Sequence, residues 1–321
     1  RIGSEDAPES AFGQVFDLAA ADDGTLYLLD WSAAEVRVFD GAGQFLRRIG
    51  RRGFGPGEFA QPMKLELVGD TLWVLDPGNA RITVFNRRGE VLGTHTSAGR
   101  GGASSWNLVH LLRDGSLLVT ASTSSAALAV DPGGQYPVLR VSGAGEAVDT
   151  VAWIARENQT LVIRDPGRPG PAGRDEAQPF GDAPIWTVSS VDDALVVVHR
   201  EASGEPDQAA FEIVKIRATG EPAARRRVRY VPVPLDDALV DETVKAIVRG
   251  AKNSPALGGA SEREIERWTR DALYVPAWLP PVDRVVVGSD GSIWLRQFQL
   301  EPDSGVWYGY DAALRPIGRV T

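Results

Sequence analysis

Short stretches of alternating apolar and polar residues run along most of the chain, and they recur at a fixed distance. The stretch 25–30 (TLYLLD) is followed 46 residues later by 71–76 (TLWVLD), and 36–40 (VRVFD) is followed at the same spacing by 82–86 (ITVFN). Alternation with a period of two is typical of β-strands. A four-stranded repeat of this length buries both of its faces only by stacking against neighbouring repeats. The pattern therefore predicts an all-β protein with the β-propeller architecture.

The repeat predicts five blades in a single propeller domain that spans residues 1–321. Asp-Gly pairs mark hairpin turns inside the blades, because both positions tolerate the positive φ that such turns need. Three of these pairs are Asp23-Gly24, Asp114-Gly115 and Asp290-Gly291. The predicted blades cover about residues 14–50, 62–97, 107–154, 185–234 and 282–320.

Two segments depart from the repeat. Residues 165–184 are rich in Pro and Gly, which predicts an extended surface loop. Residues 236–276 lose the period of two, and they predict a helical hairpin instead. Its first helix is expected over about 237–249, ending at Gly250. Its second is expected to begin at the N-cap Ser261, with Glu264 completing a capping box.

The run 47–62 (RRIGRRGFGPGEFAQP) resembles the linker between the blades of NHL repeats. The whole chain resembles the exported six-bladed propellers of many bacteria, most of which have no assigned function. The resemblance implies six blades and a periplasmic or otherwise exported protein, with membrane-surface association left open. Residues 314–318 (LRPIG) repeat the end of blade one, and 1–3 (RIG) resemble the end of an outer strand. We therefore expect a sixth blade that lies mostly beyond Thr321 and is completed by the N-terminal strand.

Composition narrows the classes of function. The formal net charge is −9, so the surface as a whole repels nucleic acid, and no basic stripe with interleaved aromatic residues is present. The absence of cysteine excludes disulfides, thiolate metal sites and cysteine nucleophiles. No apolar run reaches the length of a transmembrane helix.

The histidines and acidic residues do not form a recognisable metal motif. His110 is expected on an inner strand, His199 on a second strand and His95 on an outer strand, so they do not converge as zinc ligands. Asp30 and Asp76 occupy equivalent repeat positions, where an aspartate more often caps a turn than binds calcium. We therefore expect no metal, no cofactor and no catalytic residue. If an axial pocket binds a ligand, the candidate residues are Asp17, Lys64, His110 and Asp283.

These observations favour a non-enzymatic protein-binding scaffold, an extrinsic subunit that docks on another protein or on a membrane-embedded complex. The alternatives are a calcium-dependent lactonase or hydrolase, and a small-molecule sensor, each using the axial pocket. The helical insertion is rich in aromatic residues, which concentrate in interface cores, and arginine clusters occur at 47–52 and 225–229. The candidate partner-binding residues are Trp268, Tyr274, Trp278, Leu279, Arg51 and Arg52. The sequence leaves open whether the insertion packs on blades four and five or also docks the partner.

Overall fold

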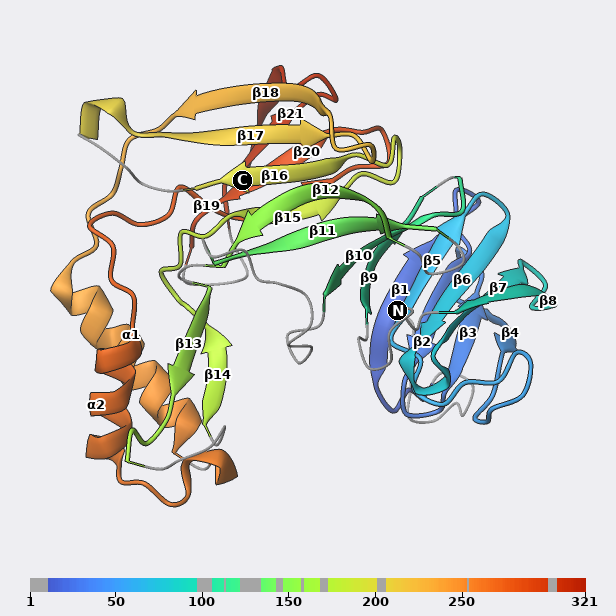
Figure 1. Cartoon of the computed structure of the whole chain (residues 1–321), viewed down its shortest axis with the longest axis horizontal. Coiled ribbons are helices and arrows are strands. Elements are labelled where there is room, and N and C mark those ends of the chain that lie inside the picture. Colours follow the sequence, from blue (N-terminus) through green and yellow to red (C-terminus); the bar gives the residue numbers. More distant parts are fainter. Residues whose placement is uncertain are drawn as a thin grey trace. The chain divides into compact units, whose positions relative to one another are not determined.

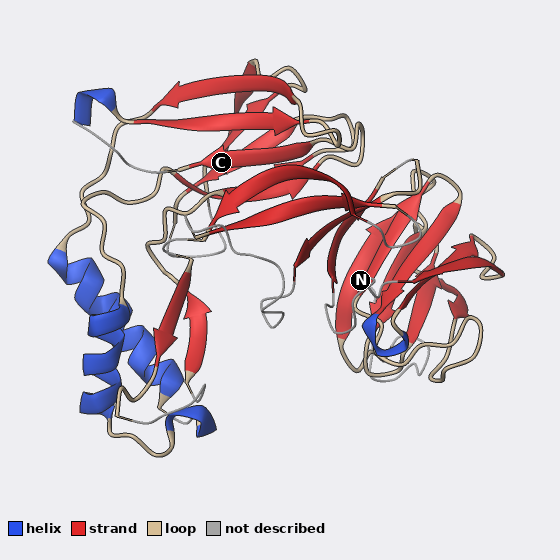
Figure 2. Ribbon diagram, viewed as in Figure 1, coloured by secondary structure: helices blue, strands red, loops and turns tan. Residues whose placement is uncertain are grey.

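The computed structural model describes residues 11–96, 106–112, 114–121, 134–142, 147–156, 159–167, 173–200, 206–252, 254–299 and 305–321. The chain forms two compact units. The first comprises Arg1–Ala129 and Pro137–Ala152, and the second comprises Val130–Tyr136 and Trp153–Thr321. Strands predominate in both, and the two longer helices belong to the second unit (Figure 2).

The first unit holds blades one and two and most of blade three. Each blade is an antiparallel four-stranded sheet whose strands follow chain order (Figure 1). Blade one contains β1 (Val15–Ala20), β2 (Leu26–Asp30), β3 (Glu35–Phe39) and β4 (Phe45–Ile49). Blade two contains β5 (Lys64–Val68), β6 (Thr71–Asp76), β7 (Arg81–Asn86) and β8 (Val91–Thr96). Blade three contains β9 (Trp106–Leu111), β10 (Leu117–Ala121), β11 (Gln135–Val141) and β12 (Ala147–Ala155).

Blades one and two stack through a shared apolar core. The core contains five buried residues from the two blades. Tyr27 and Leu29 of β2 and Val36 of β3 pack with Leu65 and Leu72 of blade two. The first strands of successive blades also lie beside one another, β1 next to β5 and β5 next to β9. This stacking face to face, with first strands adjacent, is the arrangement that the sequence repeat predicts.

The second unit contains two further blades. Blade four contains β15 (Ile185–Val188), β16 (Leu195–His199), β17 (Ala210–Ile216) and β18 (Pro222–Arg229). Blade five contains β19 (Val282–Val287), β20 (Ile293–Gln297), β21 (Trp307–Tyr310) and β22 (Pro316–Val320). Buried residues of both sheets form one core, with Val198 and Phe211 from blade four and Leu295 and Tyr310 from blade five. The predicted propeller fold, with five recognisable blades and a helical insertion, is confirmed.

The helices pack on a β-hairpin that the sequence did not predict. Helices α1 (Asp237–Ala251) and α2 (Glu262–Ala272) share a core with β13 (Thr160–Ile163), which pairs with β14 (Arg174–Ala177). The two segments lie in successive connections, from β12 to β15 and from β18 to β19. Within the second unit the hairpin and the helices come together in this core.

The structure corrects two boundaries. The segment 165–184, predicted to be an extended surface loop, contains β14, and its end is buried at Phe180. Helix α1 continues through Gly250 to Ala251, because Gly250 keeps a helical backbone and does not act as a C-cap. The capping box of Ser261 and Glu264 is confirmed. Arg1–Gly3, expected to end an outer strand, lie outside the described residues. No helix among the described residues is long and apolar enough to cross a membrane.

Candidate functional site

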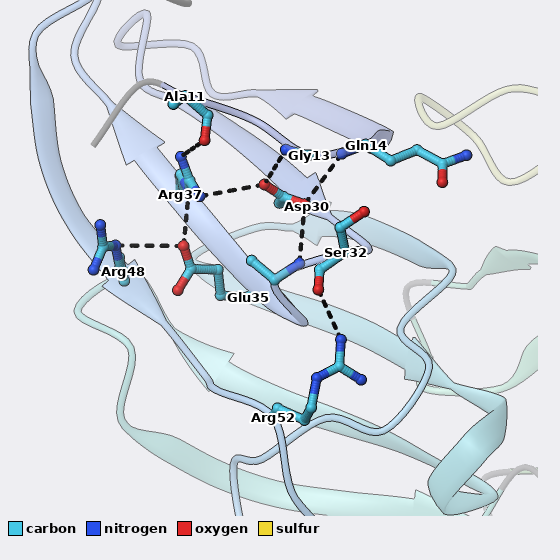
Figure 3. A network of polar contacts seen from close by, with 10 residues as sticks. Ala11, Gly13, Gln14, Asp30, Ser32, Glu35, Arg37, Arg48 and Arg52 are labelled. Atoms are coloured by element: carbon cyan, nitrogen blue, oxygen red, sulfur yellow. Dashed lines mark hydrogen bonds and ion pairs between the residues drawn. The ribbon is translucent and has the colours of Figure 1, made fainter. Parts of the chain in front are cut away.

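A buried aspartate ties each of the first two blades to the chain that enters it. The carboxylate of Asp30 accepts hydrogen bonds from the backbone N–H groups of Gly13 and Ala33, at 3.1 Å each, and it contacts the guanidinium of Arg37 at 3.3 Å (Figure 3). Asp76 does the same in blade two, where Ala60 N and Gln61 N each donate at 2.8 Å. The repeated aspartate therefore connects the second strand to the segment before the first strand.

Three of the proposed axial residues lie on first strands of the first unit. Asp17 on β1 accepts a hydrogen bond from Leu65 N on β5 at 3.0 Å, and its carboxylate lies 3.9 Å from Lys64 Nζ. One blade further on, Glu66 on β5 accepts from Leu111 N on β9 at 2.9 Å and pairs with His110. Each carboxylate thus holds the backbone of the next blade.

The structure places the three histidines on the strands that the sequence predicts. His95 lies on the fourth strand of its blade, His110 on a first strand and His199 on a second strand. His95 stacks on Trp73, with the ring centroids 4.9 Å apart. Across the part of the chain that the structure describes, no three His, Asp or Glu side chains gather into a group able to hold a metal ion.

The two arginines proposed as partner contacts bind nearby parts of their own unit. Arg51 pairs with Glu58, with 2.7 Å between Nη2 and Oε1, although its side chain is 80% exposed. Arg52 donates to the backbone oxygen of Ser32 at 2.7 Å, so it connects the linker to the loop between β2 and β3 (Figure 3). Arg52 has a structural role in the linker, while Arg51 keeps most of its surface in solvent.

In the second unit the contact between neighbouring blades is made by a buried arginine, Arg200, whereas in the first unit Asp17 and Glu66 make it. Arg200 follows β16 and donates to the backbone oxygen of Ala183 at 2.7 Å and to that of Val282 at 2.9 Å. Burial lowers the pKa of its guanidinium to about 10, and the carboxylates of Asp182 and Asp283 raise it part of the way back. Arg200 is therefore protonated at neutral pH and links the entry segments of blades four and five.

Asp283, the fourth proposed axial residue, belongs to this polar group. Its carboxylate makes a two-pronged ion pair with Arg296, at 2.7 and 3.0 Å, and accepts from Gln299 N at 3.1 Å. Such fork-shaped contacts fix geometry and satisfy both carboxylate oxygens. Asp283 therefore has a structural partner for each oxygen.

An apolar cleft of about 300 Å³ opens between blades four and five. The residues on its walls are mostly aromatic, proline or valine. They are Phe211, Val228, Arg229, Tyr230, Val231, Val233, Leu279, Pro280, Pro281, Val282, Gln297, Phe298, Tyr308 and Tyr310. A concave surface lined mainly by aromatic and apolar side chains, with some polar groups among them, is the usual form of a binding site.

The stalk of the helical insertion forms one wall of this cleft. The outgoing segment 231–235 and the returning segment 277–281 run side by side, since Leu279 N donates to Val233 O at 2.8 Å and Leu235 N to Ala277 O at 3.2 Å. Two valines of the stalk remain in solvent at the rim, Val231 at 86% exposure and Val233 at 49%. The cleft therefore continues into an exposed apolar edge.

The tyrosines of the cleft sit in surroundings of low polarity. Burial raises the pKa of Tyr230, and the carboxylate of Asp182 raises it further. Burial also raises the pKa of Tyr310, against the effect of Arg226, whose guanidinium lies over the Tyr310 ring at 5.9 Å. Among the described residues the hydroxyl of Tyr230 is buried without a hydrogen-bond partner. Tyr230 and Tyr310 are therefore neutral at physiological pH, and their rings are available for packing.

The four partner candidates in and after the insertion have different surroundings. Trp268 is only 6% exposed and belongs to the core between the helices and β13. Tyr274 is used internally, because its hydroxyl donates to Asp182 at 2.7 Å. Trp278 forms a β-bridge with Pro234 in the stalk, and Leu279 lines the cleft. Trp268, the one aromatic residue of the two helices, therefore serves packing, and the open apolar surface lies at the base of the stalk.

The sequence reasoning did not identify the main residues of the cleft. Phe298, Tyr308 and Tyr310 come from blade five, far along the chain from Tyr230 and the stalk. One local signal for the extended segments was present in the sequence. Valine and proline alternate at 231–234, before the insertion, and two prolines stand at 280–281, after it. Proline disfavours helix at both ends, so these segments form an extended stalk.

Comparison with known proteins supports the fold. Residues 8–99 match the sequence profile of a family described as 6-bladed beta-propeller, DUF5128. The matched stretch includes blades one and two. No curated protein matches the chain.

Several solved structures are similar to the propeller as a whole. One is a Bacteroides fragilis protein thought to be exported, with 13% identity, 98% of this chain and 73% of that chain covered, and a TM-score of 0.47. Another is a member of the duf4221 family from Bacteroides vulgatus, with 10% identity, coverage of 92% and 77%, and a TM-score of 0.47. A third is virginiamycin B lyase from Staphylococcus aureus, with 13% identity, coverage of 95% and 83%, and a TM-score of 0.38. Similarities this low carry no information about activity.

Proposed function

We propose that this propeller is a non-enzymatic binding module that docks a segment of a partner protein in the cleft between blades four and five. We further propose that it acts as an exported, extrinsic subunit of a larger assembly. The observation that supports docking is the continuity between the cleft and the exposed valines of the stalk. A small ligand would fill the cleft and leave the apolar residues at its rim exposed to solvent. A docked segment of a partner protein would bury those rim residues as well.

The rigidity of the site also favours binding. The cleft walls come from two stacked sheets and from a stalk held by backbone hydrogen bonds. A site built on such elements loses little conformational freedom when a partner docks. The axial carboxylates of the first unit, by contrast, hold neighbouring backbone groups.

A photo-crosslinking residue placed at position 231 tests the proposal in cells that make the protein. We expect one discrete crosslinked partner, and we expect that partner, once purified, to bind the wild-type protein. Val231→Glu should weaken this binding at least tenfold, because it places a charge on the apolar rim. Val275→Glu is the matched control, since Val275 is 50% exposed but is not among the residues that line the cleft. Equal binding by both variants would show that the cleft is not the docking site.

A further inference from the structure

A second cavity lies where the helical insertion meets the end of β13. It has a volume of about 270 Å³ and shares no lining residue with the cleft between blades four and five. Its walls are residues 256–260 in the connection between α1 and α2, Glu264 and Trp268 in the first two turns of α2, and Asp165, two residues after β13. Small-molecule sites commonly have volumes of about 300–1,000 Å³, so this cavity suits a small ligand.

One residue of the cavity wall has a hydrogen-bond donor that the protein does not use. Trp268 is 6% exposed, and its indole Nε1 is buried without a hydrogen-bond partner among the described residues. Such donors are few in folded proteins, because an unmade hydrogen bond in the interior costs free energy. Since Trp268 also lines the cavity, a ligand atom that accepts a hydrogen bond gives this N–H the partner it lacks.

The cavity also contains two carboxylates, each with one oxygen to spare. Glu264 uses Oε2 in the capping box, where Ser261 N donates at 2.9 Å and Ser261 Oγ at 2.6 Å. These bonds from Ser261 hold the pKa of Glu264 below its ordinary value of 4.5, so the group is ionised at neutral pH. Asp165 accepts from Gly167 N through Oδ1, at 2.8 Å. Among the described contacts, Oε1 of Glu264 and Oδ2 of Asp165 therefore remain available as acceptors.

Charge and hydrogen-bonding capacity together select the class of ligand. The described residues that line the cavity include no lysine, arginine or histidine, so an anion would face two carboxylates without a counter-charge. An ammonium ion pairs with carboxylates, but it has no acceptor for the N–H of Trp268. A hydroxyl group both donates and accepts. A neutral molecule with several hydroxyls therefore satisfies both carboxylates and the indole.

We infer that this cavity binds a monosaccharide, whose hydroxyls donate to Asp165 and Glu264 and accept from Nε1 of Trp268. A monosaccharide carries several hydroxyls on one compact ring, so it offers donors and an acceptor at the same time. Its ring also has little conformational freedom to lose on binding. The inference is independent of the proposed docking in the cleft.

Saturation-transfer difference NMR with four hexoses tests the inference. The probes are D-glucose, D-galactose, D-mannose and D-fructose, and sodium acetate and methylammonium chloride represent an anion and a cation. We expect at least one hexose to give a saturable signal with the wild-type protein, and the two ions to give none at the same concentrations.

Two variants and a control connect the signal with the cavity. Trp268→Phe keeps an aromatic ring but removes the N–H, and Asp165→Ala removes an acceptor at an exposed position outside the core. Each should weaken hexose binding by about tenfold, the effect expected for a lost hydrogen bond to a charged or buried group. Asp175→Ala is the control, because Asp175 is exposed on β14 of the same hairpin but does not line the cavity. This variant should bind like the wild-type protein.

Three results would overturn the inference. They are no saturable signal from any of the four hexoses, preferential binding of either ion, and equal hexose binding by the wild-type protein and Asp165→Ala. Because Asp165→Ala leaves the core intact, it gives this answer even if Trp268→Phe fails to fold. None of these results affects the crosslinking test at position 231, so the proposed function is judged separately.

Discussion

At the scale of single residues, aspartates at turns have the clearest roles. In three Asp-Gly turns the aspartate accepts hydrogen bonds from the residue two positions later: Asp23 from Thr25, Asp114 from Ser116 and Asp290 from Ser292. These bonds hold the pKa of each carboxyl below its ordinary value of 3.8. For Asp114 the hydroxyl of Ser116 has the largest effect, its backbone N–H the next, and Arg140 adds to both.

This arrangement predicts a contribution to stability that acid removes. Because the folded-state pKa of Asp114 is lowered, its contribution is complete above pH 3.8 and is lost as the pH falls through the folded-state pKa. Asp114→Asn should lower the free energy of unfolding by about 0.5 kcal/mol at pH 6, a small value because solvent screens this carboxyl. The difference from wild type should shrink at pH 3. Urea unfolding at the two pH values measures both.

The control for this prediction is Asp70→Asn, whose carboxylate is 93% exposed and contacts only the guanidinium of Arg87 among the described residues. This variant should unfold like the wild-type protein at both pH values. A difference for Asp114→Asn that is as large at pH 3 as at pH 6 would mean that the charge of Asp114 has no part in stability.

At the scale of elements, the sequence predicted what depends on local pattern and missed what depends on distant contacts. Strands with a period of two, turns with Asp-Gly and the capping box at Ser261 are each encoded within a few residues, and the structure has them. The hairpin of β13 and β14 lacks such a signal. Its strands have four residues each, and its buried side chains Leu161 and Ile163 gain their apolar surroundings from helices some 80 residues later.

The same limit explains the cleft. Apolar periodicity places Tyr308 and Tyr310 on the same face of a strand, but it does not reveal that they line a cleft together with the stalk. The aromatic residue of the helices was a candidate for partner binding because the hairpin on which it packs was not predicted. Trp268, which is buried between α1, α2 and β13, is the clearest case.

Removal of the insertion should expose the apolar face of the hairpin of β13 and β14. Replacing residues 236–276 by a short Gly-Ser linker should leave blades four and five folded, because their shared core contains none of these residues. It should also uncover Leu161 and Ile163, which are fully buried in the intact chain. We therefore expect a protein that aggregates at concentrations at which the wild type is monodisperse.

Replacing residues 159–177 together with 236–276 should restore solubility, since the two segments cover each other. Light scattering and size-exclusion chromatography compare the three proteins. A single replacement that stays as soluble as the wild type would show that β13 and β14 do not need the helices.

At the scale of the whole molecule, polar contacts join successive blades within each unit. In the first unit carboxylates make these joins, as Asp17 does to Leu65 and Glu66 does to Leu111. In the second unit the guanidinium of Arg200 makes the join through two backbone carbonyls. The carboxylates and the guanidinium carry opposite charges, but each of them fixes the first strand of one blade to the neighbouring blade.

Arg200→Met tests how much of this joining depends on the charged group. Arg200 is 7% exposed, and its loss leaves the carbonyls of Ala183 and Val282 without their donor and removes a cation from beside the carboxylate of Asp182. Removing one partner from a buried charged network typically costs about 3–5 kcal/mol, so we expect a large fall in the free energy of unfolding.

The control is Arg284→Met, at an exposed position on β19, which should change the free energy of unfolding by less than about 0.5 kcal/mol. Similar urea midpoints for the two variants would mean that apolar stacking alone joins blades four and five. A fall confined to Arg200→Met would mean instead that the cleft between these blades keeps its shape through a buried polar contact, because Val282 both accepts from Arg200 and lines the cleft.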